Sequence, residues 1–108
     1  MDISFVEFEK LDLRIGKILT AEDIPGSRNL IRMDVDFGTE KRQVIAGLKQ
    51  YYKTEGLVGE EYMFICNLEK RKLMGLESQA MIFAADDGKG NIVLIKPEKD
   101  VEIGSKVR

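Results

Sequence analysis

The feature that most constrains the fold is an interrupted alternation near the start of the chain. Leu11, Leu13 and Ile15 alternate with charged residues, which is the period of a strand with one buried face. Gly16 follows, and two successive apolar residues at positions 18 and 19 break the earlier phase. A glycine inside a strand often marks a bulge or a close approach of two backbones. The pattern predicts one long, bent strand, as a small closed barrel requires, because such a strand must serve two sheets.

Short apolar runs separated by turns follow this strand, which is typical of a mainly β domain. Alternation of apolar residues with acids predicts a second strand at Met33–Phe37. The first, second and third predicted strands together form a meander. That third strand, Arg42–Gly47, is apolar on both faces in its middle, so it is predicted to be central. Further strands are predicted at Tyr62–Cys66, Ala80–Ala85 and Asn91–Ile95, and a short connection with room for one helical turn at Lys53–Gly59. The pattern alone predicts a small β-barrel.

A short N-terminal helix is predicted from about Ser4 to Lys10. Ser4 and Glu7 have the spacing of a capping box, and the helix places Phe5 and Phe8 on one face. Two interpretations stay open: the two rings close one end of the core, or they form part of a subunit interface. The apolar residues of the C-terminal tail must also pack against something.

The length of 108 residues predicts a single domain, residues 1–108, that buries roughly two-thirds of its unfolded surface. The one cysteine, Cys66, lies in an apolar run and is interpreted as a small buried side chain, which fits a reducing, cytoplasmic setting. No apolar stretch approaches the ~20 residues needed to span a bilayer. The N-terminus lacks the regions of a signal peptide.

The composition argues against catalysis. The chain has no histidine, no partner for its cysteine and no glycine-rich phosphate loop, so no cofactor or metal site is expected. The acidic pairs Asp34/Asp36 and Asp86/Asp87 are interpreted as solvated surface charge. With 17 basic and 19 acidic residues the net charge is −2, so a nucleic-acid binder must gather its cations on one face. We expect a binding module and not an enzyme.

The segment between the fourth and fifth predicted strands carries the densest basic cluster. It is too polar for a strand and lacks the apolar rows of a helix, so an exposed loop is predicted. Lys70, Arg71 and Lys72 offer cations for phosphates, while Ser78 and Met81 offer a polar and a polarisable group for exposed bases. Two plainer readings stay open: the triplet is a solvated turn, and Met81, with apolar neighbours, belongs to the core. Other cations extend the patch if their strands adjoin it: Lys17, Arg28, Arg32, Lys41 and Arg42.

The same segment carries a spaced motif: Asn, Leu, two variable residues, Arg, Lys, Leu, a variable residue, Gly, then Ser and Met three apart. It stands here as Asn67, Leu68, Arg71, Lys72, Leu73, Gly75, Ser78 and Met81. By this motif the chain resembles the tRNA-binding domain found at the C-terminus of many methionyl-tRNA synthetases, in free-standing structure-specific tRNA-binding proteins, in endothelial monocyte-activating polypeptide-like proteins and in CsaA-type export chaperones. L-D-L-R-I-G-K, Q-V-I-A-G-L, Y-Y and I-G-S-K-V-R extend the resemblance over nearly the whole chain.

The resemblance implies an OB-fold, a five-stranded Greek-key barrel, here with a short N-terminal helix and a C-terminal extension. It implies that the domain grips the outer corner of L-shaped tRNA irrespective of the anticodon. Many relatives have a lysine where this chain has Asn29, so the charge there is in doubt, and Arg28 is the candidate substitute. The candidate tRNA-binding residues are Arg28, Asn29, Arg32, Lys41, Arg42, Asn67, Lys70, Arg71, Lys72, Ser78 and Met81.

The resemblance also implies a homodimer, for which Phe5, Phe8, Val101 and Ile103 are the candidate contacts. The favoured function is a tRNA-binding module, free-standing or associated with a methionyl-tRNA synthetase catalytic subunit, that assists aminoacylation by recruiting tRNA. The alternative is a CsaA-like chaperone that binds unfolded proteins through an exposed apolar groove, with Met74, Leu76, Tyr51 and Tyr52 as candidates. A third reading is a dimerisation or scaffold domain.

Overall fold

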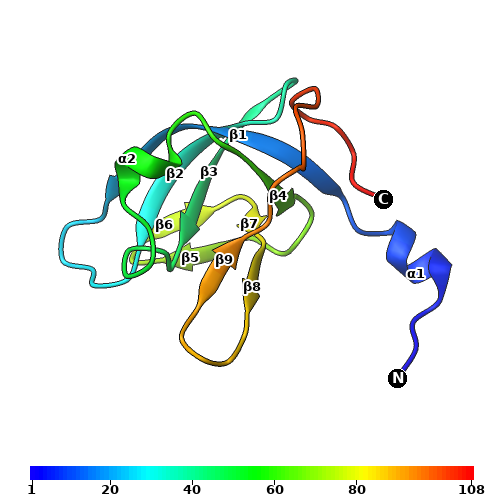
Figure 1. Cartoon of the computed structure of the whole chain (residues 1–108), viewed down its shortest axis with the longest axis horizontal. Coiled ribbons are helices and arrows are strands. Elements are labelled where there is room, and N and C mark those ends of the chain that lie inside the picture. Colours follow the sequence, from blue (N-terminus) through cyan, green and yellow to red (C-terminus); the bar gives the residue numbers. More distant parts are fainter.

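A five-stranded antiparallel sheet, in the order β3-β2-β1-β4-β7, curls into a nearly closed barrel in the computed structural model, which describes all 108 residues (Figure 1). Of the two small hairpins, β8–β9 projects from the barrel and β5–β6 lies beside β3. The fold is mainly β and OB-like, as expected. The elements are α1 (Phe5–Glu9), β1 (Leu13–Asp23), β2 (Ile31–Asp36), β3 (Lys41–Ala46), α2 (Thr54–Leu57), β4 (Glu61–Ile65), β5 (Arg71–Leu73), β6 (Leu76–Ser78), β7 (Met81–Ile82), β8 (Ala84–Asp86) and β9 (Ile92–Leu94).

The predicted long, bent strand is confirmed in β1. Its first half pairs with β4 and its second half with β2, and the β1–β2 register shifts between Ile18 and Thr20. Gly16 lies shortly before this shift, at a position where no side chain fits. A Cβ at Gly16 would stand 2.7 Å from side-chain atoms of both Val35 and Phe37. The missing side chain lets β1 cross closely over the barrel core, where Phe37 packs edge-to-face on Phe64.

The core follows from the alternation of the strands. Every second residue of β2 is buried, and Asp34 and Asp36 face outward, as predicted. Cys66 is buried and free, which confirms its interpretation as a small core side chain. Burial raises the pKa of its thiol, and the nearby Arg42 guanidinium opposes this only in part.

The C-terminal tail packs along the half of β1 that β2 does not reach. Ile15 N–H donates to Ser105 O, Gly104 N–H to Ile15 O and Val107 N–H to Leu13 O. The tail crosses the β2–β3 turn so closely that a Cβ at Gly104 would overlap the carbonyl group of Phe37. This supplies hydrogen-bond partners to backbone groups that would otherwise form an open strand edge.

Three predictions about strands were wrong. The predicted loop after β4 is the β5–β6 hairpin, whose two-residue turn has φ 51° at Met74 and 79° at Gly75. Its strands have three residues each, which is too short to show a period. The predicted strand at Ala80–Ala85 divides into β7 and β8, because the chain changes partner from β4 to β9 at Phe83. β3 lies at the edge of the sheet order and is not central.

Helix α1 stands away from the barrel and buries no residue (Figure 1). The interpretation that Phe5 and Phe8 close the core is therefore wrong. Their ring centroids lie 6.1 Å apart, and Phe5 is 70% exposed. Half of the predicted capping box is present, because Ser4 Oγ accepts a hydrogen bond from Glu7 N–H at 3.2 Å.

Candidate nucleic-acid interface

Side-chain hydrogen bonds and one backbone hydrogen bond, not a strand ladder, hold the β5–β6 hairpin and the following Gln79 against the free edge of β3. Ile45 N–H donates to Ser78 Oγ at 3.0 Å, and Gln43 N–H donates to the Gln79 side chain at 2.9 Å. Gln79 N–H donates in return to Gln43 O at 2.8 Å. These hydrogen bonds satisfy backbone groups of β3 that have no neighbouring strand, and they hold the hairpin in one orientation.

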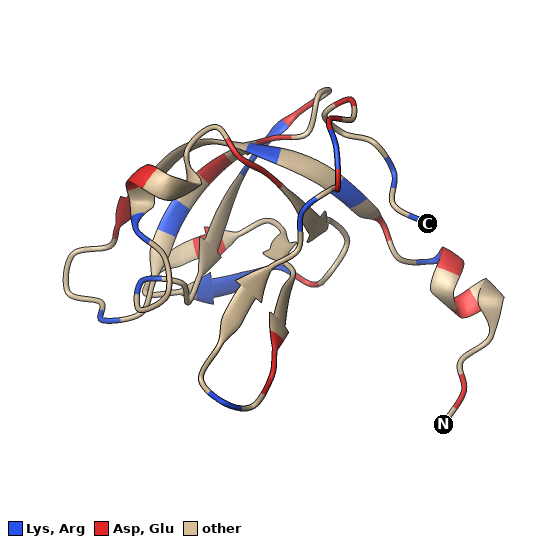
Figure 2. Cartoon of the chain, viewed as in Figure 1, with Lys and Arg blue, Asp and Glu red and all other residues tan.

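The hairpin presents the basic triplet to solvent. Lys70, Arg71 and Lys72 are exposed, and the basic stretch of β5 is visible in blue in Figure 2. Lys70 Nζ lies 3.8 Å from a Glu77 carboxylate oxygen, whereas Arg71 and Lys72 take part in no ion pair. Two cations of the triplet are therefore free to meet phosphates.

Arg71 lies beside the two groups that sequence reasoning expected near it. It pairs with Ser78 across the hairpin, and both residues line a hollow of about 50 Å³ together with Met81. Met81 is 42% exposed between buried Ala80 and Ile82, so the reading of Met81 as core is wrong. Strand alternation turns its thioether outward, beside the basic hairpin.

The β1–β2 turn adjoins the tip of the hairpin. A Cβ at Gly26 would stand 3.9 Å from Met74 Cε, so the turn that carries exposed Arg28 and Asn29 lies next to the basic hairpin. Lys49 joins this region, since its Nζ donates to Ser27 O at 3.0 Å. Sequence reasoning missed Lys49 because it follows an apolar strand, and only the fold brings it to the turn.

Lys41 is also near the triplet. It lines a hollow of about 270 Å³ together with Lys70 and Arg42. Lys17, in contrast, lies opposite Asp36 and Glu61 in the strand registers and shows no connection to the hairpin. The cations that the fold gathers are therefore those of the hairpin, the β1–β2 turn and the start of β3.

The polar atoms of several candidate residues take part in hydrogen bonds or ion pairs within the protein. Arg42 donates to Cys66 O at 2.6 Å and Gln79 O at 3.0 Å and pairs with Glu40 at 2.7 Å. Arg32 pairs with Glu22 at 2.6 Å. The Asn67 side chain accepts from Asp12 N–H and donates to Lys10 O, which ties the α1–β1 connection to the end of β4. The Asn29 side chain accepts from the Gln50 amide at 2.9 Å.

Ser78 belongs with these residues. Its hydroxyl accepts from Ile45 N–H and lies 2.9 Å from Ala80 O, to which it donates. Both hydrogen-bonding directions of the hydroxyl are thus used inside the protein. The prediction that Ser78, Asn67, Arg42 and Arg32 contact RNA stays a prediction, but the polar atoms of each take part in hydrogen bonds or ion pairs within the protein.

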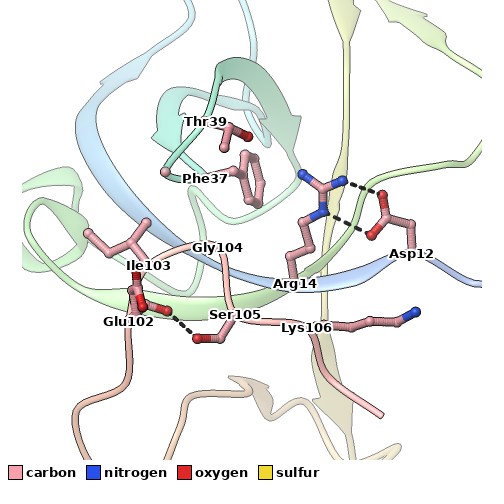
Figure 3. A pocket seen from close by; sticks show the side chains of 10 residues that line it. Asp12, Arg14, Phe37, Thr39, Glu102, Ile103, Gly104, Ser105 and Lys106 are labelled. Atoms are coloured by element: carbon pink, nitrogen blue, oxygen red, sulfur yellow. Dashed lines mark hydrogen bonds and ion pairs between the residues drawn. The ribbon is translucent and has the colours of Figure 1, made fainter.

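The largest hollow, about 790 Å³, lies elsewhere, between the start of β1, the β2–β3 turn and the tail (Figure 3). Arg14 projects into it with its guanidinium held by both carboxylate oxygens of Asp12 at 2.9 Å. That hydrogen bonding, above all, raises the pKa of Arg14. Arg14 is paired with Asp12, and the remaining charges of the lining, Glu102 and Lys106, are one acid and one base. The lining therefore has no excess of positive charge to attract an anionic ligand.

No group of three or more His, Cys, Asp or Glu side chains is arranged to hold a metal ion. No helix of the chain is long and apolar enough to cross a membrane. The candidate chaperone residues do not form one open groove, because Tyr52 packs against the core and its hydroxyl accepts a hydrogen bond from Leu94 N–H. Met74 and Tyr51 are exposed and Leu76 is half-buried.

Residues 13–106 match the protein-family model described as "Putative tRNA binding domain". Methionine–tRNA ligases of Methanocaldococcus jannaschii and Thermococcus kodakarensis are 51% and 50% identical to the chain and cover 100% and 98% of it. The chain spans only 16% and 14% of the length of those two relatives.

Two solved structures share the fold over 100% of both chains. A MetRS-related protein from Pyrococcus horikoshii has a TM-score of 0.93 and 34% identity. The chaperone CsaA from Bacillus anthracis strain Ames has a TM-score of 0.90 and 28% identity. The chain is thus similar in structure both to a MetRS-related protein and to a CsaA chaperone.

Proposed function

The chain belongs to the tRNA-binding domain family, a family of binding domains, and from this premise we propose that it is a non-catalytic module that binds folded tRNA. The observation that carries the proposal is that Arg71 and Lys72 are exposed and take part in no ion pair, and that Arg71 lines one hollow with Met81. Free cations can release the counterions of an RNA backbone, which cations already paired with carboxylates do less effectively.

The proposed face comprises the β5–β6 hairpin, the β1–β2 turn and the start of β3. The cations that this face offers to RNA are Arg28, Lys41, Lys70, Arg71 and Lys72, with Lys49 added from the structure. Because these cations are spread over three elements, they complement a folded backbone better than a flexible single strand. This supports recognition of shape, which is how proteins recognise most structured RNA.

The biological role that we propose is to raise the local concentration of tRNA for aminoacylation in the cytoplasm. The chain matches a small part of methionine–tRNA ligases, so its working partner is a methionyl-tRNA synthetase catalytic subunit, joined covalently or not. Linking a binding module to a catalytic one makes the second encounter intramolecular and increases the effective concentration of substrate.

A homodimer is part of the proposal. Phe5 and Phe8 form an apolar pair on a helix that buries no residue, and Val101 is exposed on the tail, near half-buried Ile103. A second copy would cover these side chains and double the RNA contacts. Sedimentation of the Phe5→Ala/Phe8→Ala variant should show a smaller species than the parent; equal masses for the two would remove these rings from the interface.

A chaperone is the second candidate, favoured by the similarity to CsaA. Exposed Leu68, Met74 and Met81 would supply apolar contacts for an unfolded client. Suppression of aggregation of a denatured client that added tRNA does not relieve would support this candidate over tRNA binding.

Band shifts at low salt test the main proposal. A folded tRNA transcript and an unstructured RNA of equal length are compared, because both carry the same backbone charge. Binding of the tRNA in the micromolar range or tighter, with a clear preference over the unstructured RNA, is expected. Equal binding of the two would show that charge alone governs the interaction.

A further inference from the structure

A small hollow between the β5–β6 hairpin and β3 carries two opposite charges that the fold does not use. Ile45, Leu73 and Ala80 supply apolar lining, and its volume is about 50 Å³. A space of that size has room for a few water molecules. It therefore admits the edge of one flat ring and excludes a stack of rings.

The two charges are those of Glu69 and Arg71, which both line the hollow and are both exposed. Neither takes part in an ion pair, although the neighbouring Lys70 pairs with Glu77. An unpaired carboxylate on a face that binds a polyanion lowers affinity for phosphate. A free anion at this position is better explained by selectivity, since it rejects ligands that bring no donor to it.

We infer that this hollow receives a single unstacked guanine of the bound RNA, an inference that rests on the proposed function. Guanine has two adjacent donors, N1–H and the N2 amino group, which match the two oxygens of the Glu69 carboxylate. It also has adjacent acceptors, O6 and N7, which an arginine can bind in two-pronged fashion. Donors on one edge and acceptors on the next complement a site with one carboxylate and one guanidinium.

The other bases fit this pair of charges less well. Adenine and cytosine place a ring-nitrogen lone pair beside their one amino group, so a carboxylate is repelled by one atom while it is bound by the other. Uracil has one N–H between two carbonyl oxygens. A base edge seated in the hollow displaces water from the exposed carboxylate and guanidinium, and a polar group that loses water without gaining a partner costs more than a good hydrogen bond returns. This asymmetry produces base selectivity.

The remaining lining residues can pack against a base but do not discriminate between bases. Leu68 and Met81 are exposed at this hollow and can pack on the faces of a ring. Ser78 also lines it, but its hydroxyl already accepts from Ile45 N–H and donates to Ala80 O. Selectivity thus falls to Glu69 and Arg71.

The test is an NMR titration of the whole chain with GMP, with IMP, which lacks the N2 amino group, and with AMP. The loss of one hydrogen bond to a carboxylate should weaken IMP binding about fivefold relative to GMP. The amides of residues 68–71 and 78–81 should shift most. Glu69→Gln should reduce the GMP preference to within about twofold, because a glutamine amide offers only one acceptor.

Glu77→Gln is the matched control. It removes one negative charge from the neighbouring hairpin, but Glu77 does not line the hollow, so the substitution should leave the GMP preference unchanged. Equal binding of all three nucleotides to the parent protein overturns the inference. So does a Glu69→Gln variant that binds every nucleotide more tightly to the same degree as Glu77→Gln, because Glu69 would then act only by repulsion.

Binding of whole tRNA separates this inference from the proposed function. If the parent protein binds tRNA but does not prefer GMP, the guanine site is refuted and the tRNA-binding module stands. If it prefers GMP but does not distinguish tRNA from unstructured RNA, the hollow is a nucleotide site and the proposed recognition of folded tRNA is refuted.

Discussion

Replacing Ser78 by alanine would show whether this side chain fastens the hairpin or contacts RNA. Its hydroxyl bonds to Ile45 N–H and Ala80 O, and both of those residues are buried. The substitution removes two hydrogen bonds of about 1 kcal/mol each, and the Ile45 amide is left with no partner. We expect the free energy of unfolding to fall by about 2 kcal/mol, which in a domain of this size lowers the Tm by roughly 10 °C.

Urea denaturation followed by circular dichroism measures this change. Ser4→Ala is the control, because its hydroxyl also accepts one backbone N–H but caps a helix that buries nothing. That control should change the free energy of barrel unfolding by less than about 0.5 kcal/mol. The tRNA affinity of folded Ser78→Ala should stay within about threefold of the parent. An unchanged denaturation midpoint combined with a large loss of affinity would refute the reasoning and make Ser78 a ligand contact.

Three further results are expected. Arg71→Ala/Lys72→Ala should weaken tRNA binding at least about tenfold and lower the slope of log affinity against log salt by about 2, with little change in Tm; a large fall in Tm would mean that these side chains hold the fold. Gly16→Ala should destabilise by about 1–3 kcal/mol in urea, because its methyl group meets two core side chains at 2.7 Å; an unchanged midpoint would contradict the close approach. Burial raises the pKa of the Cys66 thiol, so just above pH ~8.5 only the unfolded state loses the thiol proton. The free energy of unfolding should therefore decline as the pH rises through this range. Cys66→Ala should abolish that part of the alkaline decline.

Features that depend on a long local pattern were predictable. The alternation before Gly16 extends over five residues, and its interruption indicates the bend directly, because a closed barrel needs one strand to change sheets. The β5–β6 hairpin was not predictable in the same way. Its strands are three residues long. They are held to β3 by hydrogen bonds from Gln43 N–H to the Gln79 side chain and from Ile45 N–H to Ser78 Oγ, which join residues 36 and 33 positions apart in the sequence.

The candidate site divides along the same line. The exposure of Arg71 and Lys72 follows from local polarity and was expected. Arg42 donates to a carbonyl group 24 residues away, and Asn67 accepts from an amide group 55 residues away. No local sequence pattern predicts these hydrogen bonds. Lys49 illustrates the converse, since it reaches the β1–β2 turn only because β3 runs antiparallel to β2 and returns the chain there.

The amino-acid sequence by itself determined that this chain forms a small β-barrel with one bent strand, and that its cations are too few to bind RNA unless they gather on one face. Periodicity and net charge are properties of the chain that survive any arrangement in space. Only the tertiary structure decided which polar side chains remain free for a ligand. That choice depends on which backbone groups the strands leave without a partner. Ile45 N–H at the edge of β3, Cys66 O after β4 and Asp12 N–H before β1 are bonded to the side chains of Ser78, Arg42 and Asn67, so these side chains are not free for a ligand.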